Sequence, residues 1–141
     1  MTTKSVNLQV YKSLPNKRRI YMVKISDAEW KIMNLLWEEE PKTIMQITKE
    51  LKDITGWSKH TIITYLKRME AKGIIYHEEG DKAKLYYTCL DRGVAVLQEK
   101  ESFLSKVFKG NAGLMISTMV EQNELSDQDI DQLIELLKSK K

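Results

Sequence analysis

In the first half of the chain, hydrophobic residues recur every three or four positions, which is the spacing of one face of an α-helix. Three helices are predicted there, and each has a start signal. Ser26 with Glu29 and Thr43 with Gln46 form capping boxes, in which each side chain bonds the backbone N–H of the other residue. Ser58 is a favoured N-cap residue for the third helix. The apolar positions expected to face a common core are Trp30, Met33, Leu36, Trp37, Ile44, Ile47, Leu51, Ile62, Leu66 and Met69.

Proline and glycine mark the connections between these helices. Pro41 ends the first helix, because its ring removes a backbone donor and clashes with the preceding turn. Gly56 can take a positive φ in the turn before the third helix, and Gly73 is a favourable stop for that helix, which spans residues 58–72. Two short capped helices, a glycine turn and a third helix make up a helix-turn-helix pattern.

After Gly73 the pattern changes from helical to alternating. Residues 74–79 and 84–89 alternate between apolar and polar side chains and flank the loop 80–83, which predicts a β-hairpin. A hairpin directly after a helix-turn-helix is the wing of a winged-helix domain. Lys82 and Lys84 near its tip are candidates for contacts with phosphates or the minor groove, and the alternative is a hairpin that only caps the core.

Three more helices are predicted over residues 91–109 and 112–122 and from Ser126 onward. The helices of this tail carry apolar stripes, but the tail is too short to form a large core of its own. A dimerisation element is therefore favoured over packing onto the winged helix. Each apolar side chain removed from water contributes about 1.5–3 kcal/mol. The free energy gained by burying the apolar side chains of two copies of the last helix can therefore exceed an association cost of about 4–15 kcal/mol. The residues expected at the dimer interface are Leu104, Phe108, Ile130, Leu133, Ile134 and Leu137.

The predicted fold class is therefore mainly α with a small β-hairpin (α+β). Residues 25–90 are expected to form a winged helix-turn-helix domain, a fold that in most cases is DNA-binding, and residues 91–141 a helical dimerisation domain. Residues 1–24 show no sustained period and are expected to be a basic, poorly ordered arm. An arm that follows the DNA backbone and an extension with no role of its own are both open, and the second is favoured.

Composition limits the classes of protein. A hydrophobic content of 42% with 30% charged residues fits a soluble globular protein, and no run approaches the roughly 18 apolar residues of a membrane span. The start lacks the apolar segment of a signal peptide. We therefore expect a cytoplasmic protein without membrane insertion.

The formal charge of +3 is unevenly distributed. Residues 1–24 carry six cations and no acid, so the rest of the chain carries −3. Residues 58–72 have a local charge of +3, whereas residues 121–135 contain six acids and no lysine or arginine. A nucleic acid would be attracted to the middle of the chain and repelled by its end.

The polar face of the third helix offers hydroxyls, an imidazole and cations, which reach phosphates and base edges in a major groove. Considered alone, a helix like this is as well explained by a solvated amphipathic surface. The winged-helix context favours DNA binding, with cations on phosphates and the other side chains reading sequence. The candidate DNA-binding residues of this helix are Lys59, His60, Thr61, Thr64, Tyr65, Lys67 and Arg68.

No pattern indicates catalysis, a metal or a cofactor. His60 and His77 lie on different predicted elements without partners at ligand spacing, and Cys89 is the single cysteine. There is no phosphate-binding loop, dinucleotide fingerprint or nucleophile with an identifiable base. We therefore predict a protein that is not an enzyme.

Two motifs together carry a resemblance to a known family: the hexapeptide at residues 25–30 and the Trp-Ser-x-x-Thr pattern that begins at Trp57. From residue 25 to residue 138 the chain resembles the penicillinase-repressor family of bacterial winged-helix regulators. The matching residues are 25–30 (Ile-Ser-Asp-Ala-Glu-Trp), Met33, Leu36-Trp37, Trp57-Ser58, Thr61-Ile62, Thr64, Leu66, Arg68 and Gly73-Ile74-Ile75.

The resemblance implies a homodimeric repressor whose two third helices enter successive major grooves of a pseudo-palindromic promoter operator. Thr61, Thr64 and Arg68 match positions that contact DNA in the family. His60 and Ile63 stand where antibiotic-resistance members often have lysine and arginine, so base preference is expected to differ.

The family also implies two ways of release from DNA. The copper-responsive branch binds metal through a C-terminal pair of Cys-x-Cys motifs, and this chain has only Cys89. In the antibiotic-resistance branch a membrane sensor peptidase triggers cleavage at an Asn-Phe bond, and the register places Thr118-Met119 at that site. Two other interpretations stay open: a winged-helix protein-interaction module, and a repressor released by a small-molecule effector.

Overall fold

Capping residues set the ends of the first three helices in the computed structural model, which describes residues 24–141. Both reciprocal hydrogen bonds form in the capping boxes of Ser26 and Thr43, and the Ser58 hydroxyl accepts the Thr61 N–H at 3.2 Å. The three predicted helix starts are confirmed. The helices are α3 (Asp27–Glu38), α4 (Ile44–Thr55) and α5 (Lys59–Lys72).

Glycines end the second and third of these helices, as predicted. Gly56 and Gly73 have φ values of +69° and +80°, in the left-handed region that disfavours a residue with a Cβ. Gly56 joins α4 to α5 within three residues, so the two helices form the helix-turn-helix pair.

Two antiparallel strands follow, β1 (Ile75–Glu79) and β2 (Lys84–Thr88). The Gly80 N–H donates to the Ala83 carbonyl at 2.9 Å and closes the loop between them. Each strand is one residue shorter than predicted. Beyond the ladder, Ile74 and Cys89 keep a single hydrogen bond, from the Cys89 N–H to the Ile74 carbonyl at 2.9 Å.

The hairpin is fastened to the chain that precedes α4. Lys42 and Tyr86 exchange two backbone hydrogen bonds, so Lys42 adds a one-residue bridge beside β2. The Glu40 carboxylate accepts from the Thr88 N–H at 2.8 Å and from its hydroxyl at 2.9 Å. The wing is therefore held along β2 by side-chain and backbone contacts as well as by its own ladder.

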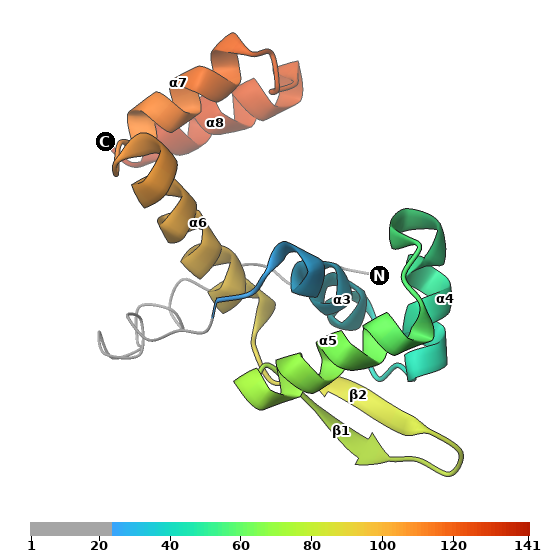
Figure 1. The fold of residues 1–141 in the computed structure, drawn as a ribbon. Helices are drawn as coiled ribbons and strands as arrows, with labels where there is room; N and C mark the ends of the chain where they lie inside the picture. The colour runs from blue at the N-terminus through green and yellow to red at the C-terminus, as the bar shows by residue number, and fades with distance from the viewer. Residues whose placement is uncertain (1–23) are drawn as a thin grey trace. The chain divides into compact units, whose positions relative to one another are not determined.

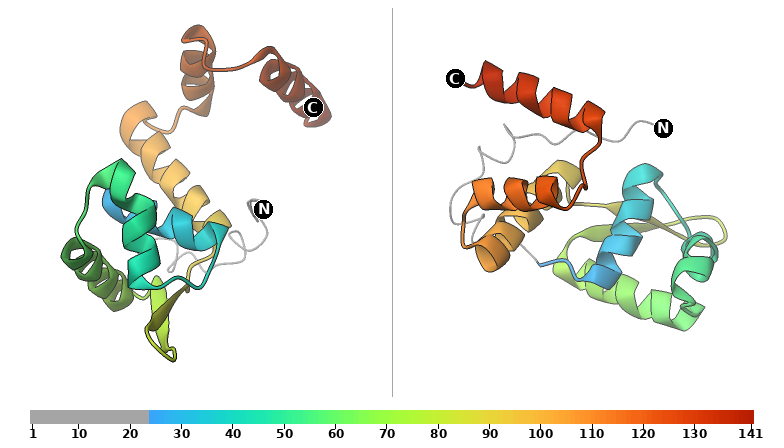
Figure 2. Two further views of the ribbon diagram at one scale, coloured as in Figure 1. Left: turned by 90° about the vertical axis from the view of Figure 1, so that its right-hand side faces the viewer. Right: turned by 90° about the horizontal axis from the view of Figure 1, so that it is seen from above.

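One core lies among α3, α4, α5 and the wing, whose arrangement is visible in Figures 1 and 2. Trp30 was expected to be buried but is half-buried, with its ring edge-on to Trp37 at 5.5 Å. The Trp37 indole N–H donates to the Leu90 carbonyl at 2.9 Å. The buried apolar residues of this core are Ile25, Ile32, Met33, Leu36, Trp37, Ile47, Leu51, Ile62, Leu66, Met69, Ile74, Ile75, Tyr86 and Ala95.

Three helices complete the chain: α6 (Arg92–Phe108), α7 (Ala112–Glu121) and α8 (Asp127–Ser139). The described residues divide into two compact units between Gln98 and Glu99, within α6. Val94, Ala95 and Leu97 are buried, whereas no side chain from residue 99 to residue 141 is buried.

The fold class predicted from the sequence, mainly α with a small hairpin, is confirmed. Of the arm predicted over residues 1–24, all but Lys24 lies outside the described residues. Within residues 24–141, no helix combines the length and the apolar character that crossing a bilayer requires.

Candidate nucleic-acid interface

α5, the green helix labelled in Figure 1, has polar side chains on the face opposite its buried stripe. Ile62, Leu66 and Met69 are buried against the core, so the rotation of the helix is fixed by apolar contacts. That rotation sets how far each of the seven candidate DNA-binding residues is exposed. Lys59, His60, Thr64, Lys67 and Arg68 are exposed, and Thr61 and Tyr65 are half-buried.

The two threonine hydroxyls are partly engaged within the helix. Thr64 Oγ1 donates to the His60 carbonyl at 3.1 Å, and the Thr61 and Ser58 hydroxyls lie 3.1 Å apart. A hydroxyl has one donor hydrogen and two acceptor lone pairs. Thr64 is therefore left chiefly as an acceptor, which suits the amino groups of adenine or cytosine in a major groove.

Aromatic contacts support the same face. The rings of Trp57 and Tyr65 lie 4.9 Å apart at 44°, and the Arg68 guanidinium carbon lies 5.7 Å from the Tyr65 ring centroid. Trp57 was not among the predicted site residues. Trp57 precedes the N-cap Ser58 and lies outside α5, so helical spacing does not link it to Tyr65 and the sequence pattern gave no signal for this contact.

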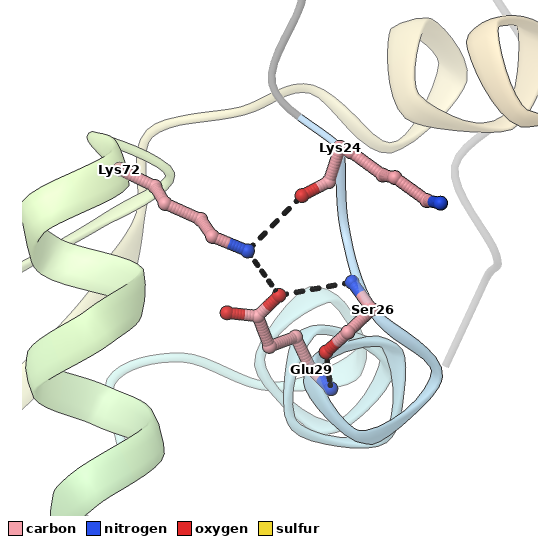
Figure 3. Close-up of polar contacts among 4 residues, drawn as sticks. All are labelled: Lys24, Ser26, Glu29 and Lys72. Carbon is pink, nitrogen blue, oxygen red and sulfur yellow. Dashed lines mark hydrogen bonds and ion pairs between the residues drawn. The ribbon is translucent and has the colours of Figure 1, made fainter.

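Lys72 was counted among the cations of this stretch, but its ammonium is engaged elsewhere (Figure 3). Lys72 Nζ lies 2.5 Å from Glu29 Oε1 and donates to the Lys24 carbonyl at 3.1 Å. The Glu29 side chain is fully buried and also accepts the Ser26 N–H at 2.9 Å. Burial by itself raises the pKa of Glu29, but the Lys72 ammonium and the Ser26 hydrogen bonds outweigh it and lower that pKa.

Glu70, the acid of the helix, is directed toward the wing. His77 Nδ1 lies 2.5 Å from Glu70 Oε1, and His77 Nε2 lies 3.6 Å from Glu79 Oε1. With Glu70 and Lys72 both engaged, the charges left on the polar face are those of Lys59, Lys67 and Arg68. The imidazole joins α5 to β1, a connection that sequence reasoning did not find.

The wing lysines are exposed, but their surroundings are mixed in charge. Lys82 lies in the loop and Lys84 begins β2, and Glu78, Glu79 and Asp81 are exposed near them. The strands pair Glu79 directly with Lys84. The wing therefore adds little net positive charge, and attraction for an anion comes mainly from α5.

The tail leaves a large apolar surface in the single chain. Among the predicted interface residues, Leu104, Phe108 and Leu133 are half-buried, and Ile130, Ile134 and Leu137 are exposed. Leu137 keeps 61% of its surface exposed. Thr118 and Met119 lie within α7, half-buried and exposed respectively. Other exposed apolar residues of the tail, not predicted for this surface, are Phe103, Val107, Leu114, Ile116, Val120 and Leu136.

Chemistry at Cys89 is disfavoured. Cys89 is exposed as a residue, but partial burial of its thiol and the nearby carboxylates of Glu70 and Glu40 raise the pKa of the thiol. The reactive thiolate is therefore rare at neutral pH. Among residues 24–141, no three potential metal-ligating side chains converge.

Comparison with known proteins identifies relatives. Residues 25–139 match the penicillinase repressor family. The chain is 30% identical to the methicillin resistance regulatory protein MecI of Mammaliicoccus sciuri over 116 residues, which cover 82% of this chain and 94% of the relative. It is 29% identical to the penicillinase repressor of Bacillus licheniformis over 117 residues, covering 83% and 91%.

Among solved structures, the DNA-binding domain of the repressor BlaI matches with 32% identity and a TM-score of 0.46, over 52% of this chain and 93% of that domain. The family match spans the winged helix and the tail together. The chain therefore belongs to the penicillinase repressor family, a family of transcriptional repressors that bind DNA through a winged helix.

Proposed function

We propose that this chain is a homodimeric transcriptional repressor that binds a pseudo-palindromic promoter operator through α5 and the wing. The observation that carries this proposal is the polar face of α5. Lys59, Lys67 and Arg68 project from it and form no ion pair with residues 24–141, while Glu70 and Lys72 of the same helix are engaged in the fold. Unpaired cations beside short polar side chains fit a phosphate-lined groove.

The side chains divide into two roles. Lys59, Lys67 and Arg68, with Lys82 and Lys84 of the wing, supply phosphate contacts and affinity. His60, Thr61 and Thr64 face base edges and supply selectivity, because each base pair presents its own pattern of donors and acceptors in the major groove. Tyr65 lies on the same face as a further candidate. The relatives named as a regulatory protein and a repressor support the repressor function.

Dimerisation is proposed through the tail. A single α5 makes few base contacts, whereas two linked copies read half-sites about 10 bp apart. Ile130, Ile134 and Leu137 are exposed on α8 in the single chain, and every side chain after residue 98 keeps part of its surface in water. A second copy that covers this surface gains about 1.5–3 kcal/mol for each side chain fully removed from water.

The test of DNA binding is fluorescence anisotropy with a 30-bp duplex that the wild-type protein has enriched from a random library. Arg68→Ala should weaken binding and reduce the salt slope by about 1, since each phosphate contact contributes roughly 0.9. Lys138→Ala removes the same charge from α8 and is the control. Failure of the wild type to enrich any sequence, or an unchanged slope in Arg68→Ala, would refute the assignment.

The test of the dimer is analytical ultracentrifugation. Ile134→Asp places a charge in the proposed interface and should shift the protein to monomer, whereas Gln132→Asp introduces the same residue on the polar side of α8 and should leave the dimer intact. If both variants sediment like the wild type, the interface lies elsewhere.

Release from DNA is proposed to follow cleavage between Thr118 and Met119. The bond lies within α7, where the Thr118 hydroxyl donates to the Leu114 carbonyl at 2.8 Å, so the helix has to open before a peptidase acting on extended chains can bind. No side chain of α7 is buried in the single chain, which lowers the cost of opening. Intact-mass measurement on protein from cells with induced target genes should give two fragments that divide at residue 118. Full-length protein alone would exclude cleavage.

A further inference from the structure

Tyr65 lies at the centre of a three-residue stack that ends in an exposed charge. Its ring contacts Trp57 at 4.9 Å, and both rings are half-buried and packed against the core of the winged helix. The Arg68 guanidinium carbon lies 5.7 Å from the centroid of the same ring. The two rings are held against the core, and the stack places the long, flexible Arg68 side chain against them.

Nothing else among the described residues holds Arg68. It forms no ion pair with residues 24–141, and Glu70, the acid of the same helix, contacts His77 instead. An unsupported arginine loses much rotamer freedom when it binds. A guanidinium held over an aromatic ring is restrained in advance, and the N–H groups at its edge stay available to a carboxylate, phosphate or base.

Given the proposed function, we infer that Tyr65 is a positioning residue for Arg68. Trp57 fixes the Tyr65 ring, and the ring holds the guanidinium in the orientation that contacts DNA. Tyr65 then raises DNA affinity through Arg68 and not through a contact of its own with a base, although its place on α5 makes it a candidate for direct reading.

A double-mutant cycle separates the two roles. Anisotropy is measured with the enriched duplex for the wild type, Tyr65→Leu, Arg68→Gln and the double variant. Tyr65→Leu alone should weaken binding by about 2–5-fold, the range of an exposed cation–π contact. In the Arg68→Gln background the same replacement should change the dissociation constant by less than about 2-fold.

Conservative replacements separate positioning from folding. Tyr65→Phe keeps the ring and should bind within about 2-fold of the wild type. Because Tyr65 also packs against the core, Tyr65→Met is compared with Tyr65→Leu, and all titrations are made well below the thermal unfolding midpoint of each variant. Arg68→Lys keeps the charge but not the planar fork, and its affinity should depend less on Tyr65 than that of the wild type.

The outcomes are distinct. Equal losses from Tyr65→Leu in both backgrounds would overturn the inference and make Tyr65 a direct contact. A loss in Tyr65→Phe as large as in Tyr65→Leu would overturn it as well, in favour of the hydroxyl. Failure of the wild type to enrich any duplex would overturn the repressor function and the inference together.

Discussion

Replacing Lys72 with methionine tests the contact that fixes the end of α5 against the start of α3. The variant keeps most of the side-chain volume but leaves the buried Glu29 carboxylate without its ammonium partner. Removal of one partner of a buried pair costs about 3–5 kcal/mol. The Lys72 side chain is 28% exposed, so water screens part of the interaction and we expect a loss of about 2–3 kcal/mol at pH 7.

The cost should be asymmetric between the partners. In Glu29→Gln the amide oxygen still accepts the Ser26 N–H, and Lys72 can turn toward water, so the loss should be about 1–2 kcal/mol. For a domain of this size the Lys72→Met loss corresponds to a fall of about 8–24 °C in the unfolding midpoint. Urea unfolding followed by tryptophan fluorescence gives the free energies directly.

The loss should also depend on pH. The pKa of Glu29 is lower in the folded than in the unfolded chain, so the ion pair stabilises the fold above the ordinary carboxyl pKa. That contribution disappears as pH falls through the lowered folded value. The difference between wild type and Lys72→Met should therefore be full at pH 7 and shrink below about pH 5.

Lys67→Met is the matched control, since Lys67 is exposed on the same helix and forms no ion pair with residues 24–141. It should cost less than about 0.5 kcal/mol. A Lys72→Met loss as small as this would show that the contact in Figure 3 adds little to stability. A larger loss of the same size at pH 4 and pH 7 would show that it does not arise from the ionised pair.

Replacing three glycines with alanine should change the free energy of unfolding in different directions. A Cβ on Gly80 would lie 2.6 Å from the Ala83 carbonyl oxygen, so Gly80→Ala should distort the wing loop and destabilise by about 1–3 kcal/mol, with altered amide shifts confined to the hairpin in NMR spectra. Gly113→Ala, in α7 with its nearest neighbour at 3.5 Å, should instead raise helicity and add about 0.5–1 kcal/mol in thermal unfolding. Gly56→Ala meets no atom within 4 Å, yet its φ of +69° should cost about 1 kcal/mol in urea unfolding. Equal effects at all three positions would contradict this reasoning.

Helix ends and the wing were predictable because their signals are local. A capping box lies within four residues, as at Ser26 and Thr43, and a change from helical to alternating period marks the hairpin. The half-burial of Trp30 was not predictable in the same way. Helical spacing gives the side of the helix that a residue occupies, but not how far the neighbouring elements cover it.

The identity of the polar residues on α5 was predictable, but their engagement was not. Lys72 looked like one more cation, because its partner Glu29 lies 43 residues earlier and no periodic pattern links them. Glu70 likewise pairs with His77 across a change of secondary structure. Sequence spacing describes neighbours on one helix, whereas these pairs arise only when α3, α5 and β1 meet.

The wing is fastened at both strands: the contact of Glu70 with His77 ties β1 to α5, and the contacts of Glu40 and Lys42 tie β2 to the segment before α4. A hairpin held in this way cannot swing independently of α5. If α5 occupies a major groove, the separation between that groove and the phosphates beneath the wing is set by the protein. The duplex would then have to bend or twist to match, so stiff and flexible base steps that no side chain touches would alter affinity through the cost of deforming them.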